Sequence, residues 1–122
     1  MRLAFNLKYQ GGQYGVAILS RTPITTTDHR LYLNTREAER RGFIRGPRST
    51  SARCFLNFVT THLDYQHDDE RLFETKQLLA ALQDIKEPLI VVGDFNDVPA
   101  GAAYKLMRQQ FDDAWIESNK GC

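Results

Sequence analysis

The stretch Leu89-Ile90-Val91-Val92-Gly93-Asp94-Phe95-Asn96-Asp97-Val98-Pro99 decides the fold of this chain. It opens with four consecutive apolar residues, three of them β-branched, and this composition is typical of a strand that is buried on both faces. Gly93 ends the apolar run, and Pro99 is well placed for the first turn of a helix. The stretch therefore predicts a strand, a short polar turn and a helix.

Three polar side chains lie in that turn, namely Asp94, Asn96 and Asp97. Open α/β sheets usually carry their chemistry at such strand ends, so Asp94 and Asn96 are candidate functional residues. A purely structural interpretation is also open, in which Asp97 or Asn96 caps the following helix and Asp94 closes an Asx-turn. Whether the turn has a function depends on what the rest of the chain places beside it.

The residues before this strand predict a helix and an earlier, parallel strand. Residues 53–63 are rich in aromatic and β-branched residues, which are typical of strands. Residues 69–86 predict an amphipathic helix with Asp68 or Asp69 as its cap, and a proline ends it. A strand–helix–strand unit makes its two strands parallel, so we expect His62 and Asp94 to meet at one sheet edge. A histidine in such a place is, however, often a hydrogen-bonded core residue.

The remaining elements follow from turn residues and from the apolar pattern. We expect a strand over residues 14–20, an extended stretch over 24–33, a hairpin of strands 42–45 and 53–60 around a loop at 46–51, and a last helix over 100–111. Residues 1–8 favour no single element, and no element is expected after the last helix.

Length and composition set limits on the class of protein. A chain of 122 residues is one domain at most, and 42% hydrophobic with 25% charged residues is ordinary for a globular protein. No apolar run approaches the roughly 20 residues that a membrane-spanning helix needs. The formal net charge of +1 by itself indicates no polyanionic partner.

The charge is nevertheless uneven, because residues 36–53 hold six arginines against two glutamates, which leaves +4. Guanidinium groups match phosphate oxygens, so Arg41 and Arg45 are candidate substrate-binding residues. A non-catalytic phosphate- or nucleic-acid-binding fragment that uses the arginine-rich hairpin 36–53 is therefore an alternative to an enzyme. Arginines that are simply solvated on an exposed hairpin would show the same pattern.

Four motifs occur in a particular order along residues 11–116. They are Tyr-Gly-Val-Ala-Ile-Leu-Ser-Arg at 14–21, Thr-His-Leu-Asp at 61–64, Gly-Asp-Phe-Asn-Asp-Val-Pro at 93–99 and Asp-Ala-Trp at 113–115. In this order the chain resembles the DNase I-like endonuclease/exonuclease/phosphatase superfamily. The resemblance implies an α/β fold with a mixed sheet, as part of a four-layer α/β/β/α sandwich. Residues 1–122 would then form a partial domain, about half of the full one.

The resemblance also implies a metal-dependent phosphoester hydrolase of the nuclease or phosphatase type. In that family pattern Asp94 orients or deprotonates the attacking water, Asn96 donates to a phosphoryl oxygen, and His62 acts as an acid or transition-state stabiliser. The implied cofactor is Mg²⁺ or Mn²⁺, and Asp94 and Asn96 would touch the metal only if a second ion takes part. The substrate is a phosphate ester, with nucleic acid, phospholipid and inositol phosphate not distinguished.

Parts of the family pattern have no match in this sequence. The metal-holding glutamate is absent, since Glu37 and Glu39 lie in the wrong element, and the first asparagine and the last aspartate–histidine pair are also missing. We therefore expect an internal fragment that binds metal weakly and hydrolyses slowly or not at all. We also expect exposed sheet edges to favour self-association. No cellular location follows from the sequence.

Overall fold

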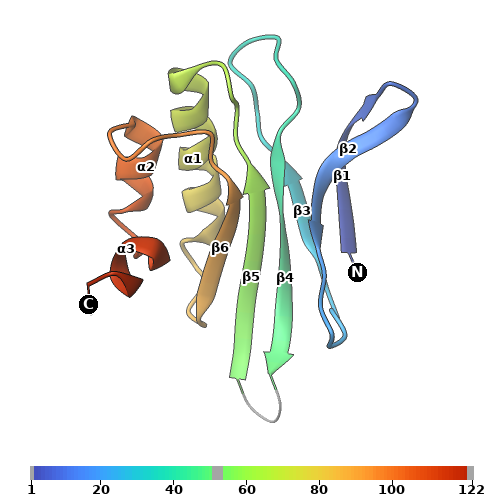
Figure 1. The fold of residues 1–122 in the computed structure, drawn as a ribbon. Coiled ribbons are helices and arrows are strands. Elements are labelled where there is room, and N and C mark those ends of the chain that lie inside the picture. Colours follow the sequence, from blue (N-terminus) through green and yellow to red (C-terminus); the bar gives the residue numbers. More distant parts are fainter. Residues whose placement is uncertain (1, 51–53, 121–122) are drawn as a thin grey trace.

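A computed structural model describes residues 2–50 and 54–120 as a mixed α/β fold (Figure 1). The strands are β1 (Arg2–Tyr9), β2 (Gly12–Ile18), β3 (Asp28–Leu31), β4 (Gly42–Thr50), β5 (Cys54–His62) and β6 (Leu89–Asp94). The helices are α1 (Asp68–Leu82), α2 (Ala102–Met107) and α3 (Ala114–Ser118). No helix in the part of the chain that the structure describes is long and apolar enough to cross a membrane.

The strands form two sheets. A four-stranded sheet has the order β3-β4-β5-β6, with antiparallel pairs except for the parallel pair β5–β6, and β1 and β2 form a separate antiparallel hairpin. Figure 1 shows α1 and α2 on one side of the larger sheet and the β1–β2 hairpin on the other. The expected strand–helix–strand unit is confirmed, and the described residues supply a helical layer, a sheet and part of a second sheet.

Two apolar clusters hold these layers together. The cluster between the larger sheet and α1 contains Tyr32, Phe43, Val59, Leu63, Leu78 and Leu82. The cluster between the larger sheet and the hairpin contains Ala4, Ile18, Ile24 and Ile44, with Phe58 packed against it. Neighbouring residues of β5 therefore face opposite layers, as the two-residue period of a strand requires. By the same alternation, the side chain of His62 lies on the hairpin side.

Residues 1–8 favoured no element, and the structure shows most of them as β1. The turn to β2 consists of Gln10 and Gly11, both with positive φ (47° and 80°), which is the geometry of a two-residue hairpin turn. The strand forms because it has β2 as a partner and because Ala4 is buried in the cluster under the hairpin. Tertiary pairing thus decides a segment whose own pattern is ambiguous.

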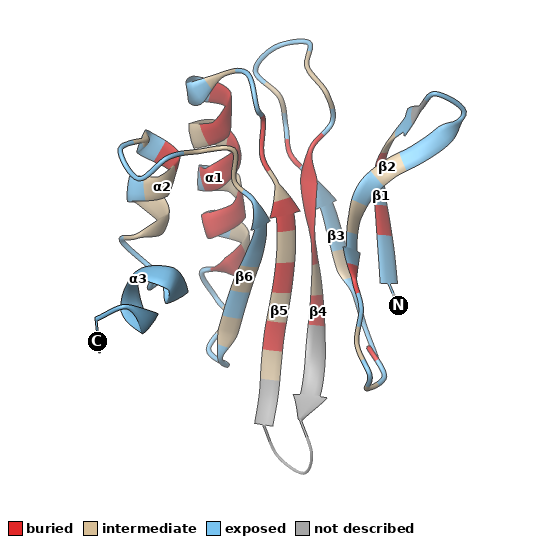
Figure 2. Cartoon of the chain, viewed as in Figure 1, coloured by how far each residue is buried: buried red, intermediate tan, exposed pale blue. Residues whose placement is uncertain are grey.

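The prediction that the strand at residues 89–92 is buried on both faces was wrong. Leu89 and Val91 pack against the cluster under α1, but Ile90 is 43% exposed and Val92 is 37% exposed. The hairpin packs over β4 and β5, whereas β6 is the outermost strand of its sheet. Figure 2 shows the resulting exposed stripe along β6. An apolar run marks a strand, but it does not tell whether a second layer covers both faces.

Several predicted boundaries were also wrong. β4 continues to Thr50, so residues 46–50 are strand rather than loop, while residue 51 lies outside the described residues. Pro47 fits within this strand because β3 pairs only with residues 42–45, which leaves one side of β4 at Pro47 without a ladder partner in β3. The helix predicted over 69–86 ends at Leu82, and the one predicted over 100–111 is limited to α2.

The ends of the helices correct two further expectations. His67, and neither Asp68 nor Asp69, stands at the N-cap of α1, and its side chain makes no cap hydrogen bond. An additional helix, α3, follows α2, because the carboxylate of Asp113 accepts hydrogen bonds from the backbone N–H groups of Trp115 and Ile116. An aspartate capping a five-residue helix is a weak sequence signal, since α3 buries none of its residues.

Candidate active site

The parallel pairing of β5 and β6 places His62 directly beside Asp94, and each is the last residue of its strand. The Nε2 atom of His62 lies 3.8 Å from Oδ2 of Asp94. The backbone N–H of Leu63 donates to the carbonyl oxygen of Asp94 at 3.0 Å, so the two strand ends stay joined beyond the last ladder pair. The structure therefore brings together the imidazole and the carboxylate that the sequence predicted at one edge.

Gly93 allows this close approach of the strands. Its φ is +146°, and a Cβ atom built there would lie 2.0 Å from the carbonyl oxygen of Thr61 on β5. No side chain fits at that distance, and L-residues rarely adopt this backbone conformation. The glycine that ends the apolar run is therefore a geometric requirement of the site.

Asn96 is hydrogen-bonded to the ends of both strands at the same edge of the sheet, which we call the rim. Its backbone N–H donates to Oδ1 of Asp94 at 3.0 Å, and its side-chain Nδ2 donates to the carbonyl oxygen of Leu63 at 2.8 Å. Its φ of +48° is a left-handed conformation that asparagine tolerates better than most residues. The structural interpretation of an Asx-turn at Asp94 is thus confirmed, and the turn holds the Asn96 amide beside the His62–Asp94 pair.

Asp97 has a structural role and does not take part in the cluster of His62, Asp94 and Asn96. Its carboxylate accepts the backbone N–H of Tyr104 in the first turn of α2 at 2.8 Å, and Nε of Arg71 lies 3.9 Å from its other oxygen. This is the helix-capping role that the structural interpretation allowed. Of the three polar residues at the end of β6, Asp97 bonds to α2, Asp94 lies beside His62, and Asn96 bonds to Asp94 and Leu63.

The second ring nitrogen of His62 lies among hydrogen-bond donors. The hydroxyl of Tyr14 is 2.7 Å from Nδ1, Nη1 of Arg41 is 2.9 Å from it, and the same Nη1 donates to the Tyr14 hydroxyl at 3.1 Å. Burial lowers the pKa of His62, the positive charge of Arg41 lowers it further, and the charges of Asp94 and Glu39 oppose this shift. Burial and the charge of Arg41 therefore favour the neutral form of the His62 imidazole.

Sequence reasoning missed Tyr14 as a partner of His62. The two residues are 48 positions apart and lie on different sheets, β2 and β5. The motif at residues 14–21 predicted a strand, but nothing in that motif indicated which side chain of another sheet its tyrosine would contact. Only the packing of the hairpin over β5 produces this contact.

Arg41 is a buried residue, so the interpretation of a solvated arginine is wrong at this position. Its side chain is 3% exposed, Nη2 donates to Oε2 of Glu39 at 2.8 Å, and its guanidinium lies 5.5 Å from the Tyr14 ring centre and 5.7 Å from that of Tyr65. Such ring contacts are favourable for a cation. A role in binding substrate stays a prediction for this residue.

Two other arginines of residues 36–53, Arg36 and Arg45, form intramolecular ion pairs. Arg45 is half-buried with Nη2 3.8 Å from Oδ2 of Asp28, and Arg36 pairs with Asp69 and Glu70. The side chains of Arg48 and Arg53 lie outside the described residues. These ion pairs reduce the positive field that the arginine-rich segment 36–53 would offer to a polyanion. Substrate binding by Arg45 stays a prediction.

A buried polar network supports the loop that follows β5. The backbone N–H of Asp64 donates to Oε2 of Glu74 at 2.7 Å, and Nη1 of Arg71 donates to the carbonyl oxygen of Asp64 at 3.1 Å. Burial raises the pKa of Glu74 to about 7, and the nearby charges of Asp64 and Glu70 act in the same direction. Glu74 and Arg71 of helix α1 therefore hold the loop that directly follows His62.

The residues at the rim do not supply a complete Mg²⁺ site. Within residues 2–50 and 54–120 there is no group of three or more His, Cys, Asp or Glu side chains that could hold a metal ion. Asp94 already accepts from Asn96, and Glu39 is bonded to Arg41. Mg²⁺ requires six oxygen ligands, several of which are commonly water, and one carboxylate with one amide is a sparse protein contribution.

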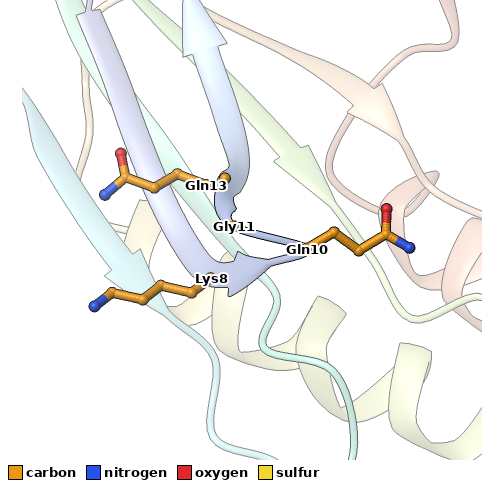
Figure 3. Close-up of a pocket in the computed structure, with 5 residues that line it drawn as sticks. Lys8, Gln10, Gly11 and Gln13 are labelled. Carbon is orange, nitrogen blue, oxygen red and sulfur yellow. The ribbon is translucent and has the colours of Figure 1, made fainter.

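Asp94 and Asn96 open onto a cleft of about 1000 Å³ between β6 and helices α2 and α3. Its walls are mainly apolar, with the exposed residues of β6, Met107 and Trp115 among them. A second, smaller hollow of about 660 Å³ lies at the β1–β2 turn, where Figure 3 shows the side chain of Gln10 pointing away from those of Lys8 and Gln13. That hollow contains none of the candidate residues.

A mixed sheet with polar side chains gathered where two parallel strands end defines an α/β protein with a strand-end site. The model of the Endonuclease/Exonuclease/phosphatase family matches residues 3–120, so the chain belongs to that family. At the level of the family, the activity is phosphoester hydrolysis. No curated protein sequence matches the chain.

Two solved structures have a similar fold. A functionally unknown conserved protein from Enterococcus faecalis V583 has a TM-score of 0.68 and 20% identity over 75% of this chain and 40% of that one. The human Nocturnin catalytic domain with bound sulfate anion has a TM-score of 0.58 and 23% identity over 72% of this chain and 35% of that one. The likeness to the Nocturnin catalytic domain supports a DNase I-like fold. The chain spans less than half of either structure.

Proposed function

We propose that this chain carries the water-activating and phosphate-orienting part of a phosphoester hydrolase site. One observation carries the proposal: His62, Asp94 and Asn96 meet at the rim where β5 and β6 end, with the imidazole 3.8 Å from the carboxylate. Family membership supplies the reaction class. The substrate is a phosphate ester, and nucleic acids, phospholipids and inositol phosphates all belong to this class.

Each side chain suits one part of the reaction. Asp94 takes a proton from a water molecule as the oxygen of that water forms a bond to phosphorus and the bond to the leaving oxygen breaks. Asn96 is oriented by its bond to Leu63, and its amide carries a second N–H that donates to a phosphoryl oxygen. His62 stabilises the charge that develops on the phosphoryl group, and the departing oxygen is protonated by solvent.

The family is generally metal-dependent, and Mg²⁺ or Mn²⁺ dependence is part of the proposal. An ion at Asp94 and Asn96 would need further ligands, because the described residues provide no cluster of three metal-binding side chains. We therefore propose that residues 1–122 by themselves hydrolyse phosphoesters slowly. Hydrolysis by this chain at the rates of intact family members would contradict that part of the proposal.

The test is release of p-nitrophenol from bis(p-nitrophenyl) phosphate and from p-nitrophenyl phosphate by the complete gene product. We expect one of the two esters to be hydrolysed with added Mg²⁺ or Mn²⁺ and hydrolysis to be lost with a chelator. Replacing Asn96 by alanine should lower kcat about a hundredfold, since one oxyanion donor is removed. Unchanged turnover in Asn96→Ala would contradict the role of the amide.

We also propose that the chain self-associates through β6. Among the described residues β6 is the last strand of its sheet and has two exposed apolar side chains, Ile90 and Val92, and such edges pair with other strands. In sedimentation velocity the apparent mass of the chain should rise with concentration, and Ile90→Lys should suppress that rise. Leu19→Lys is the matched control, because Leu19 is 76% exposed but lies outside β6. Equal association in both variants would contradict pairing through β6.

A further inference from the structure

We propose that Arg41 is a positioning residue, which together with Tyr14 holds His62 as the tautomer with its hydrogen on Nε2. His62 then meets a phosphoester as a hydrogen-bond donor. This role rests on the proposed function and assigns Arg41 a place in it that requires no contact with substrate. The three residues come from three separate segments: β2, the residue before β4, and the end of β5.

The direction of the hydrogen bonds fixes the tautomer. A guanidinium group has five N–H donors and no acceptor, so the Arg41 nitrogen 2.9 Å from Nδ1 of His62 can only donate to it. A hydrogen on Nδ1 would face the hydrogens of Arg41 at that distance. Nδ1 must therefore present its lone pair, and the single hydrogen of the neutral ring lies on Nε2.

Tyr14 reinforces the same assignment. Its hydroxyl oxygen accepts a hydrogen bond from Nη1 of Arg41 at 3.1 Å, which directs the hydroxyl hydrogen towards Nδ1 of His62 at 2.7 Å. Both neighbours of Nδ1 then act as donors that share its single lone pair. The tyrosine ring and the arginine are also stacked with 5.5 Å between the guanidinium carbon and the ring centre, so the two donors hold each other in place.

The consequence of this tautomer concerns Nε2, on the side of the imidazole ring opposite Nδ1. Nε2 faces the rim where Asp94 lies at 3.8 Å, a distance too long for a strong hydrogen bond. An N–H at that position can turn to the oxygen of a phosphoryl group beside Asp94. A neutral imidazole that donates through its N–H stabilises a developing oxyanion, and it leaves the proton-accepting role to the carboxylate.

Burial of Arg41 favours a positioning role over direct contact with substrate. Its side chain is 3% exposed, Nη1 is used by His62 and Tyr14, and Nη2 is used by Glu39. The charged groups that face the imidazole are Arg41, Asp94 and Glu39. Lysine at position 41 would keep the charge but lose the fork of donors that reaches both Nδ1 and Tyr14.

The test is nitrogen NMR of the protein labelled with ¹⁵N-histidine, at a pH where the imidazole is neutral. In the wild type, Nε2 of His62 should give the signal of a hydrogen-bearing nitrogen and Nδ1 that of a bare one. Arg41→Met should mix or invert the two signals, because Tyr14 can then accept a hydrogen from Nδ1. Arg41→Lys and Tyr14→Phe should give intermediate spectra and still report if Arg41→Met fails to fold. Arg45→Met is the matched control, since Arg45 pairs with Asp28 and should leave the His62 signals unchanged.

A hydrogen on Nδ1 of wild-type His62, or the wild-type pattern in all three variants at positions 41 and 14, would overturn the inference. A kinetic comparison separates it from the proposed function. Arg41→Met should lower kcat about tenfold with KM almost unchanged, whereas loss of a substrate contact would raise KM. If the wild type hydrolyses no phosphoester, the proposed function fails, and the NMR pattern still decides the tautomer.

Discussion

Asp94→Asn should lower kcat for phosphoester hydrolysis on the order of a thousandfold, because the amide cannot take a proton from water. The fold should survive, since the new side chain still has an oxygen that can accept the backbone N–H of Asn96, as Oδ1 of Asp94 does at 3.0 Å. Steady-state turnover of the complete gene product measures the loss of activity. Circular dichroism checks that the fold is retained.

Asp84→Asn is the control for this loss of charge. Asp84 is an exposed carboxylate in the turn after α1, at the opposite end of β6 from the site. It should leave kcat within about twofold of the wild type, as expected for a surface substitution. Equal turnover of Asp94→Asn and Asp84→Asn would contradict a role of Asp94 in the reaction.

Gly93→Ala should lower the free energy of unfolding by about 3 kcal/mol or more. Two costs combine: a φ of +146° strains an alanine backbone, and the new methyl group would lie 2.0 Å from the carbonyl oxygen of Thr61. The β5 and β6 ends would have to separate, so the distance between His62 and Asp94 would also grow. Urea denaturation at a fixed temperature gives the difference in free energy.

Gly11→Ala separates the two costs. Gly11 also has a positive φ, +80°, but a Cβ atom built there would meet nothing within 4 Å. It should therefore lose only the backbone contribution, about 1–2 kcal/mol. If both variants lost the same amount, the contact with Thr61 would have no energetic weight.

The sequence predicted the part of the site that depends on local connectivity. A strand, an amphipathic helix and a second strand in succession allow little choice but a parallel pair, and the pair fixes His62 beside Asp94. The turn after β6 was predictable for the same reason, because Gly93, Asp94 and Asn96 each satisfy a local backbone requirement.

The remainder depends on which layers pack together, which periodicity does not encode. Burial of Arg41 and the contact of Tyr14 with His62 arise only when the hairpin covers β5. The exposure of Ile90 and Val92 has the same origin, since the hairpin packs over β4 and β5 and these two β6 side chains stay exposed. An apolar pattern along a strand is identical whether its second face is covered or open.

The contacts that build the rim indicate an order in which parts of this chain fold. The contact between Asn96 and Leu63 spans 33 residues within one strand–helix–strand unit, whereas that between Tyr14 and His62 spans 48 and needs a separate hairpin to dock. Contacts at shorter separation within one unit form with a smaller loss of chain entropy. The contact between Arg41 and Nδ1 of His62 spans only 21 residues, so we expect a partly folded chain to assemble the carboxylate, the amide and this first donor to the imidazole before the N-terminal hairpin docks. Docking of the hairpin would then add Tyr14 as the second donor to Nδ1.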